Sequence, residues 1–309
     1  MEPHPSPPPT RQPTRERAPV RDPRPYQIAV LAGLLVYGVF VLRFDVSPAQ
    51  IAVTLGAGLA AQWACSRLSG LPRFDPLSAL ISSLSLCLLL RTGSLWLAAL
   101  ASAIAVASKF VLRVRGKHVF NPSNLALVVL LLLPGSAWVS PGQWGSVATF
   151  AFVLACAGGL VVNRALCSDV TYAFLATYAG LLVWRAVKLG DPWTIPLHQM
   201  ESGALVLFAF FMISDPRTTP NSRLGRVLFG VAVAALAHAI TYRFFRTNGL
   251  LWALAALSPA VPLLDLLLPG PRFQWRPLAA PDLPSPKGAS DETVVIPVSR
   301  DPLGMPARP

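Results

Sequence analysis

The sequence predicts an all-α polytopic membrane protein, a helical bundle of about ten transmembrane helices. Of its 309 residues, 53% are hydrophobic and only 13% are charged, whereas a soluble domain carries about 25% charged residues. The charges form short clusters between long apolar runs, and Lys and Arg gather on alternate connections. A soluble protein needs polar surface cover. Lipid removes that need, so a membrane bundle explains this composition.

Ten apolar segments follow one another along the chain. A helix that crosses about 30 Å of hydrocarbon needs roughly 20 residues. Segments 76–91 and 201–214 are short of this length, and such segments can be broken or re-entrant where they face protein. The ten segments are 26–42, 49–65, 76–91, 93–112, 121–139, 145–163, 170–187, 201–214, 225–241 and 249–268.

The composition of both chain ends differs from that of the helical domain, 26–268. Residues 1–25 are rich in Pro and Arg, and residues 269–309 are again Pro-rich and polar. Such sequences cannot bury enough apolar surface to fold, so we expect two disordered tails. No cleavage site follows the first apolar run, so it is not a secretory signal.

The placement of Lys and Arg predicts the orientation. Most basic residues fall on the side of the N-terminus, including the cluster between 109 and 117, while the loop 136–144 has no charge. Cytoplasmic loops carry the excess of Lys and Arg. We therefore expect a multi-pass protein of a bacterial-type inner membrane, with both termini in the cytoplasm.

Other classes of function fit the sequence less well. The net charge is +12, but the basic residues punctuate apolar segments instead of forming a face for nucleic acid. We therefore expect the lipid bilayer, and no nucleic acid, as a partner. We expect no metal site, because the four cysteines are not clustered as thiolate ligands are. A phosphate-binding glycine loop and a nucleophile–base pair are also missing, so a self-contained soluble-type enzyme is not supported.

Small residues predict one packing face. Ala52, Gly56 and Ala60 are four residues apart, so they share a helix face that lets another helix approach. Ala and Gly are common in this chain, so the pattern indicates packing and no function.

A possible internal repeat has an offset of 94 residues. It relates Asp75 to Asp169, Arg91 to Arg185, and Asn121-Pro122 to Asp215-Pro216. Many membrane carriers are built from repeats, with sites near the repeat interface. If the repeat is real, it pairs the two proline elements across one interface; coincidence of charges at span ends is the alternative.

The first polar element begins a predicted span and reads Gly116-Lys117-His118-Val119-Phe120-Asn121-Pro122-Ser123-Asn124. Pro suits the first turn of a helix, and Asn or Ser can cap it. A helix start with these neighbours can also bind an anion or a polar ring edge. Lys117, Asn121, Ser123 and Asn124 are therefore candidate binding residues.

The second polar element ends a predicted span and reads Met212-Ile213-Ser214-Asp215-Pro216-Arg217-Thr218-Thr219-Pro220. Asp-Pro and Thr-Pro mark a turn, and an ordinary cytoplasmic loop is one interpretation. Two prolines, two threonines and an acid–base pair restrict this stretch strongly. We favour a site or a tight interhelical plug with Asp215, Arg217, Thr218 and Thr219 as candidates.

Three further residues are candidates by position. Thr149 and Thr171 each lie near the start of an apolar run, where Ser or Thr at a helix start is the ordinary interpretation. Asp265 falls in the last predicted span. An ionisable group at membrane depth is a functional candidate, so Asp265 is a candidate for an ion pathway, with snorkelling to the interface as the alternative.

These elements resemble the RnfD/NqrB family. RnfD is a membrane component of the Rnf electron-transport complex, and its relative NqrB belongs to the sodium-pumping NADH:quinone reductase. The likeness is carried by Lys117-x-x-Phe120-Asn121-Pro122-Ser123 and Phe211-Met212-Ile213-Ser214-Asp215-Pro216, and less specifically by Pro259-x-x-Pro262-Leu263-Leu264-Asp265. It covers the chain from about 27 to 268, in the same order.

The resemblance implies a flavin-carrying subunit of a redox-driven ion pump, with other membrane subunits as partners. In that family FMN is linked through its phosphate to a Thr that ends a Ser-Gly-Ala-Thr-like motif. Ser146-Val147-Ala148-Thr149 falls at the corresponding place, with Val147 in place of the glycine. Thr149 is the first candidate for attachment and Thr171 the second.

The leading hypothesis is a membrane electron-transfer subunit without complete activity of its own. FMN would lie at the outer end of the bundle near Thr149. The inner polar residues would line an ion path or a second, non-covalent cofactor site, where Lys117 or Arg217 stabilises a reduced anion. The alternatives are a cofactor-free transporter or channel and a scaffold subunit of a membrane complex.

Overall fold

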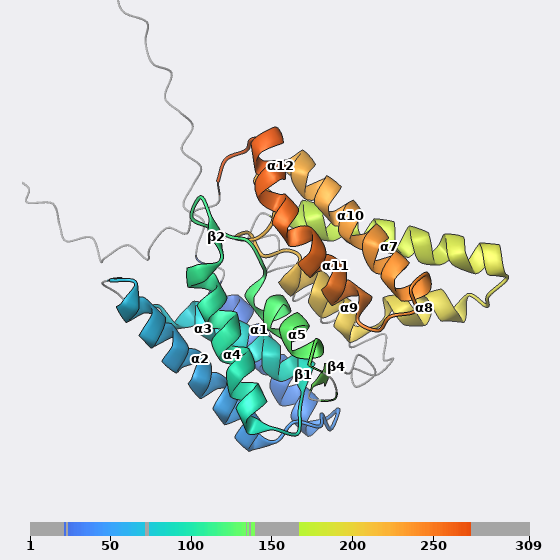
Figure 1. The fold of residues 1–309 in the computed structure, drawn as a ribbon. Helices are drawn as coiled ribbons and strands as arrows, with labels where there is room; N and C mark the ends of the chain where they lie inside the picture. The colour runs from blue at the N-terminus through green and yellow to red at the C-terminus, as the bar shows by residue number, and fades with distance from the viewer. Residues whose placement is uncertain are drawn as a thin grey trace, which may run out of the picture. The chain divides into compact units, whose positions relative to one another are not determined.

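The computed structural model describes residues 22, 24–71, 74–133, 135, 137–139 and 167–272, and these are mostly helical (Figure 1). Before the gap at 140–166, the helices are α1 (Arg24–Phe40), α2 (Pro48–Leu68), α3 (Pro76–Leu89), α4 (Leu95–Val111) and α5 (Pro122–Leu131). After it come α7 (Ser168–Leu189), α8 (Thr194–Met200), α9 (Gly203–Leu207), the π-helix η2 (Phe208–Met212), α10 (Arg223–Tyr242), α11 (Gly249–Leu257), the 3-10 turn η3 (Ser258–Ala260) and α12 (Val261–Leu267).

Two short antiparallel strand pairs connect these helices. β1 (Leu90–Arg91) pairs with β4 (Trp138–Val139), and β2 (Arg113–Val114) forms a hairpin with β3 (Lys117–His118). The hairpin turns through Arg115 and Gly116, both at positive φ (52° and 76°). It carries the chain from the end of α4 to the start of α5.

Each predicted apolar segment except the sixth contains a helix; the sixth, 145–163, lies outside the described residues. Within the described ranges, three helices are long and apolar enough to cross a membrane: Ser168–Leu189, Arg223–Tyr242 and Gly249–Leu267. The pair Thr194–Met200 and Gly203–Met212 bends by 44° and makes a fourth if it is one span. The predicted count of ten therefore stays a prediction, whereas the mostly helical, apolar class is confirmed.

Helix starts follow local chemistry. Ser47, Asp75, Asn121 and Ser222 cap α2, α3, α5 and α10, and each side chain accepts a hydrogen bond from a backbone N–H of the first turn. Proline follows the cap in α2, α3 and α5, where its missing N–H costs nothing. The cap predicted at Asn121 is confirmed.

The helix α2 places its polar side inward. Its buried residues are Gln50, Thr54, Gly58, Gln62 and Ser66, whereas Ala52, Gly56 and Ala60 are exposed. The predicted small-residue face therefore packs against no helix in the described part of the chain. Gly58 makes the close approach, since a Cβ there would lie 2.1 Å from Ser83 Oγ and 2.6 Å from Ser102 Oγ.

Large apolar side chains face outward on several helices. Phe40, Trp96 and Trp184 are 70%, 71% and 56% exposed. Further large apolar side chains are exposed on these and other helices, whereas large apolar patches are rare on soluble proteins. Together with the inward polar stripe of α2, this exposure indicates helices that are solvated by lipid.

The 94-residue offset describes the two halves only in part. Asp75 caps α3, and Asp169 lies in the first turn of α7. Asn121-Pro122, however, starts a helix, whereas Asp215-Pro216 follows one. The two proline elements nevertheless meet as expected, because Asn121 Nδ2 donates to the Met212 carbonyl at 3.1 Å.

Candidate functional site

The start of α5 joins elements that are distant in the sequence. Asn121 Oδ1 accepts the Asn124 N–H at 3.0 Å while its Nδ2 reaches the end of η2. Asn124 Nδ2 donates to Leu251 O of α11 at 3.1 Å, and Ser123 Oγ donates to Ser82 O of α3 at 3.2 Å. These three predicted residues therefore fix α5 against three neighbours.

The turn after η2 is closed by its own polar groups. The Asp215 carbonyl accepts the N–H groups of Thr218 and Thr219, both at 3.0 Å, and their hydroxyls at 3.2 and 3.1 Å. The Asp215 carboxylate accepts the Arg217 N–H at 3.0 Å. Both threonines are buried, so they stabilise the turn that places Asp215 and Arg217.

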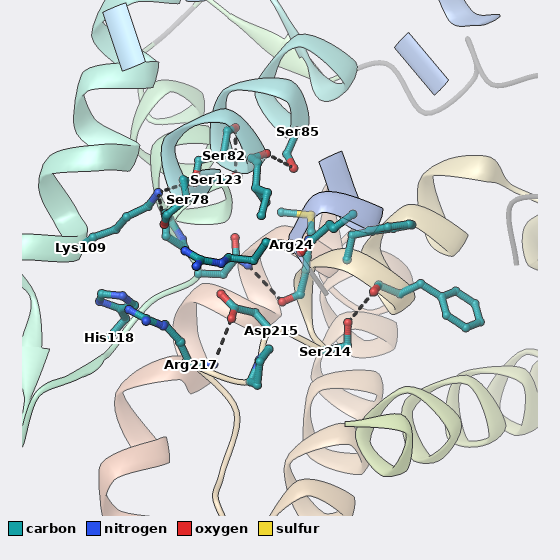
Figure 2. A pocket seen from close by; sticks show the side chains of 18 of the residues that line it. Arg24, Ser78, Ser82, Ser85, Lys109, His118, Ser123, Ser214, Asp215 and Arg217 are labelled. Atoms are coloured by element: carbon teal, nitrogen blue, oxygen red, sulfur yellow. Dashed lines mark hydrogen bonds between the residues drawn. The ribbon is translucent and has the colours of Figure 1, made fainter. Parts of the chain in front are cut away.

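A polar cavity of about 90 Å³ lies between these two elements and α3 (Figure 2). It is well below the roughly 300–1,000 Å³ of small-molecule sites and holds about three waters at roughly 30 Å³ each. A flavin ring does not fit in this volume, whereas a small ion that has lost most of its hydration shell does. Its polar lining is Arg24, Gln27, Asp75, Ser78, Ser82, Ser85, Lys109, His118, Asn121, Ser123, Ser214, Asp215 and Arg217.

Lys109 is a buried cation of this cavity that the sequence did not single out as a site. Its side chain comes from the last turn of α4, and the residue is only 4% exposed. Its ammonium donates to Ser78 O at 2.6 Å and to Ser78 Oγ at 3.1 Å. In the sequence it was one basic residue of an inner cluster; only the rotation of α4 turns it inward.

His118 faces the same cavity from the hairpin. It is 7% exposed, and its Nδ1 has no hydrogen-bond partner among the described residues. Burial lowers the pKa of His118 to about 3, and the positive charges of Arg217, Arg113 and Lys109 act in the same direction. The imidazole is therefore neutral at pH 7.

Asp215 adds a carboxyl group to the cavity lining. Burial raises the pKa of this carboxyl, against the hydrogen bond from the Arg217 N–H and the charges of Arg217, Lys109 and Lys117. Arg217, which lines the same cavity, is exposed. The cavity thus combines ionisable groups of both kinds, acidic and basic, with serine oxygens.

Lys117 and Asp265 form a pair beside this cavity. Lys117 Nζ lies 2.8 Å from Asp265 Oδ2 and 3.1 Å from Asn221 Oδ1, and it also donates to Thr219 O. Asp265 Oδ1 accepts the Asn221 N–H at 2.7 Å. Burial lowers the pKa of Lys117, and Asp265 opposes this shift. The structure thus shows a latch between the hairpin and α12; the ion-pathway role of Asp265 stays a prediction.

The two candidate threonines for flavin attachment differ. Thr149 lies outside the described residues. Thr171 is fully buried, and its hydroxyl donates to Ala209 O at 2.9 Å. An enclosed, bonded hydroxyl cannot take a phosphoester without moving η2 away from α7, so Thr171 does not fit this role.

A second cavity, of about 270 Å³, lies at the opposite end of the helices. Its lining is mostly apolar, and Tyr242 donates to Gln199 Oε1 at 2.6 Å in its wall. Val139, which lines it, is the last described residue before the segment that contains Thr149. Mostly apolar walls with a few polar groups are typical of organic ligand sites.

Comparisons with known proteins bear on this site. Residues 132–273 match the model of the NQR2, RnfD, RnfE family. The RnfD-type protein of the ion-translocating oxidoreductase complex of Pseudomonas paraeruginosa is 26% identical over 81% of this chain and 91% of that protein. The resemblance to this family is confirmed. Proteins of the same name from Citrobacter koseri and Haemophilus influenzae are 29% and 30% identical, over 43% and 35% of this chain and 36% and 31% of their own length.

The match to the NQR2, RnfD, RnfE family model covers part of the site. It includes the turn at Asp215, the latch residue Asp265 and both candidate threonines. Lys109 and the hairpin with His118 lie before it. Among the described residues, no group of three or more His, Cys, Asp or Glu could hold a metal ion.

Proposed function

We propose that this chain is the RnfD-type membrane component of an ion-translocating oxidoreductase complex in a bacterial-type inner membrane. The near full-length similarity to the Pseudomonas paraeruginosa protein supports this, as do the apolar outward surfaces of the helices. The name of that relative implies a complex, so other membrane subunits are the expected partners.

The cavity at Lys109, His118 and Asp215 is proposed as part of the ion path. The observation that carries this proposal is a water-sized polar cavity with buried ionisable groups inside a bundle whose outer face is apolar. Lys109 lies in a predicted span, and ionisable groups within spans are costly and mark ion or proton pathways. The turn after η2 and the start of α5 line the cavity, and Arg217 in this lining is exposed.

FMN is proposed at the opposite end, attached to Thr149. The 270 Å³ cavity, close to the lower limit of roughly 300 Å³ for ligand sites, supports this because it begins where the described chain approaches that segment. Gln199, Tyr242 and Asn248 are among the polar side chains there, and they would orient the ring. Bound FMN supplies one- and two-electron transfer, and the protein tunes its potential through such contacts.

The test is spectroscopic. The purified protein should show flavin absorbance and, after denaturing electrophoresis, in-gel flavin fluorescence. Thr149→Val should abolish the fluorescent band, whereas Thr171→Val, which removes only a buried hydroxyl, should keep it. Loss of the flavin on denaturation would contradict the covalent link, but it would still support FMN as a bound cofactor.

A colourless protein would favour the second candidate function, a transporter or channel without a cofactor. The polar cavity supports this candidate equally well, because nothing in its lining requires a redox group. A scaffold role, the third candidate, would not explain why Lys109 and His118 are buried around a cavity.

A further inference from the structure

Lys109 is held by oxygen atoms only. Its ammonium lies 2.6 Å from the Ser78 carbonyl and 3.1 Å from the Ser78 hydroxyl, and it makes no ion pair among the described residues. The Ser78 carbonyl also accepts the Ser82 hydroxyl at 3.1 Å. Carbonyl and hydroxyl oxygens are also the kinds of ligand that hard alkali and alkaline-earth cations take in proteins.

Lys109 adds a positive charge to the cavity lining. Among the described residues, the lining also has two further cationic side chains, Arg24 and Arg217, and two carboxyl groups, Asp75 and Asp215. The Lys109 ammonium repels a free cation that enters a cavity of this size, because a like charge about 4 Å away costs about 4 kcal/mol at an effective dielectric constant of 20.

The oxygen contacts of Lys109 and its charge in the cavity lead to one inference. We infer that the Lys109 ammonium is a tethered cation, which occupies a monovalent-cation site built by Ser78 and keeps a Na⁺-sized ion out of the cavity until it withdraws. This inference rests on the proposed ion path. Asp215 lines the same cavity (Figure 2), and it is the carboxyl group towards which the ammonium would withdraw.

The dipoles of α4 and α3 act on the Lys109 ammonium in opposite directions. It lies in the last turn of α4, where the helix dipole stabilises a cation. Its partner Ser78 lies in the first turn of α3, where the dipole opposes one. The dipole of α4 thus favours the ammonium, whereas the dipole of α3 opposes it at Ser78.

The opposite interpretation is an anchor for a bound anion. The unpartnered Nδ1 of His118 and the N-terminus of α5 lie in the same lining. However, the Lys109 ammonium is already directed at the Ser78 oxygens, and the α5 cap N–H of Asn124 is taken by Asn121. The geometry therefore favours the cation.

The experiment measures Na⁺-dependent thermal stabilisation of the full-length protein in detergent, with choline chloride keeping the ionic strength constant. In Lys109→Met, the Na⁺ concentration for half-maximal stabilisation should fall at least about tenfold relative to the unmodified protein, since the repelling charge is gone. Adding Ser78→Ala to this variant should raise that concentration again, because the site loses its hydroxyl ligand.

Lys188→Met is the matched control. Lys188 lies in the last turn of α7 and is exposed, so this variant removes the same charge without touching the cavity and should respond to Na⁺ as the unmodified protein does. If Lys109→Met does not fold, Lys109→Gln keeps an amide donor for Ser78 and should show the same direction of change.

An unchanged Na⁺ response in both Lys109 variants would overturn the inference. So would a stabilisation by chloride over gluconate that disappears in Lys109→Met, because it would make Lys109 an anion anchor. The flavin measurements above are independent of this titration. A flavin-free protein with the expected Na⁺ response would contradict the redox proposal, but it would still support the inference that Lys109 is a tethered cation.

Discussion

At the scale of single residues, the Lys117–Asp265 pair is the contact with the clearest energetic consequence. The two side chains are 12% and 15% exposed, so removing one leaves the other charge largely buried. Lys117→Met should destabilise the protein by roughly 3 kcal/mol in detergent unfolding experiments. The double variant Lys117→Met with Asp265→Leu should recover part of this loss, because no lone charge remains. Additive losses in the double variant would contradict the latch.

The burial of His118 predicts that the stability of the protein depends on pH. Its pKa falls to about 3 in the folded protein, below the usual value of about 6.5 in the unfolded chain. The free energy of unfolding is therefore highest, as far as His118 affects it, above about pH 6.5, where the imidazole is neutral in both states. It decreases as the pH falls towards about 3, by at most about 1.4 kcal/mol per pH unit. Between pH 7.5 and 4.5, the unfolding midpoint of the His118→Gln variant should fall less steeply than that of the unmodified protein. Parallel curves would show that His118 does not take up the proton.

The role of a side chain could be predicted from the sequence where it hydrogen-bonds to backbone groups of its own helix start or turn. Asn121 caps its helix, and the threonines after Asp215 hold their turn, because Asn, Asp and Thr bond nearby backbone groups. Lys109 and Ser78 are 31 residues apart, and their meeting depends on the rotation of α4 against α3. The burial of Thr171 against η2 is likewise tertiary, so the sequence could not exclude it as an attachment site.

At the scale of elements, the glycines of α2 make a matched pair. A Cβ at Gly58 would lie 2.1 Å from Ser83 Oγ, beside the 2.9 Å Ser83–Ser102 hydrogen bond that joins α3 to α4. A Cβ at Gly56 meets nothing within 4 Å. Gly58→Ala should therefore destabilise the protein, whereas Gly56→Ala should stabilise it by up to about 1 kcal/mol through helix propensity.

Thermal unfolding in detergent gives the sign of both changes. Equal effects of the two alanines would mean that α2 does not pack through Gly58. A loss in Gly56→Ala alone would instead place a partner on the exposed small-residue face, which the described chain leaves uncovered.

Helix positions were predictable from the sequence, and their faces were not. The apolar segments locate the helices, and the short segment 201–214 contains α9 and η2, which together bend by 44° from α8. For α2, however, the sequence pattern of Ala52, Gly56 and Ala60 selected the exposed side. In lipid both faces of a helix are rich in small and apolar residues, so hydrophobic periodicity no longer identifies the buried face.

At the scale of the whole molecule, the bonds between elements define one end of the helices. Lys109 with Ser78, Lys117 with Asn221, and Arg226 with Asp169 bring together the starts of α3, α7 and α10, the end of α4 and the hairpin. The turns at Gly190 and Asn248 belong to the other end, since α7 and α10 run away from the first.

This arrangement and the distribution of basic residues predict a labelling pattern. In a variant without the native cysteines, single cysteines at the exposed positions Ser69 and Arg115 should react with a membrane-impermeant maleimide only after the cells are opened. Cysteines at the exposed positions Pro192 and Arg246 should react in intact cells. The reason is that the hairpin end carries the excess of Lys and Arg, which stays in the cytoplasm.

The four positions also test the crossings, because two or more helices separate the positions of each pair. A fully reversed pattern would contradict the orientation and keep the number of crossings. A mixed pattern, in which Ser69 and Arg115 label from different sides, would mean that α3 and α4 do not cross as a pair. Since α3 has 14 residues and α4 has 17, less than the roughly 20 of a usual span, such a mixed pattern would mean that one of these short helices around the polar cavity ends within the bilayer while the other crosses it.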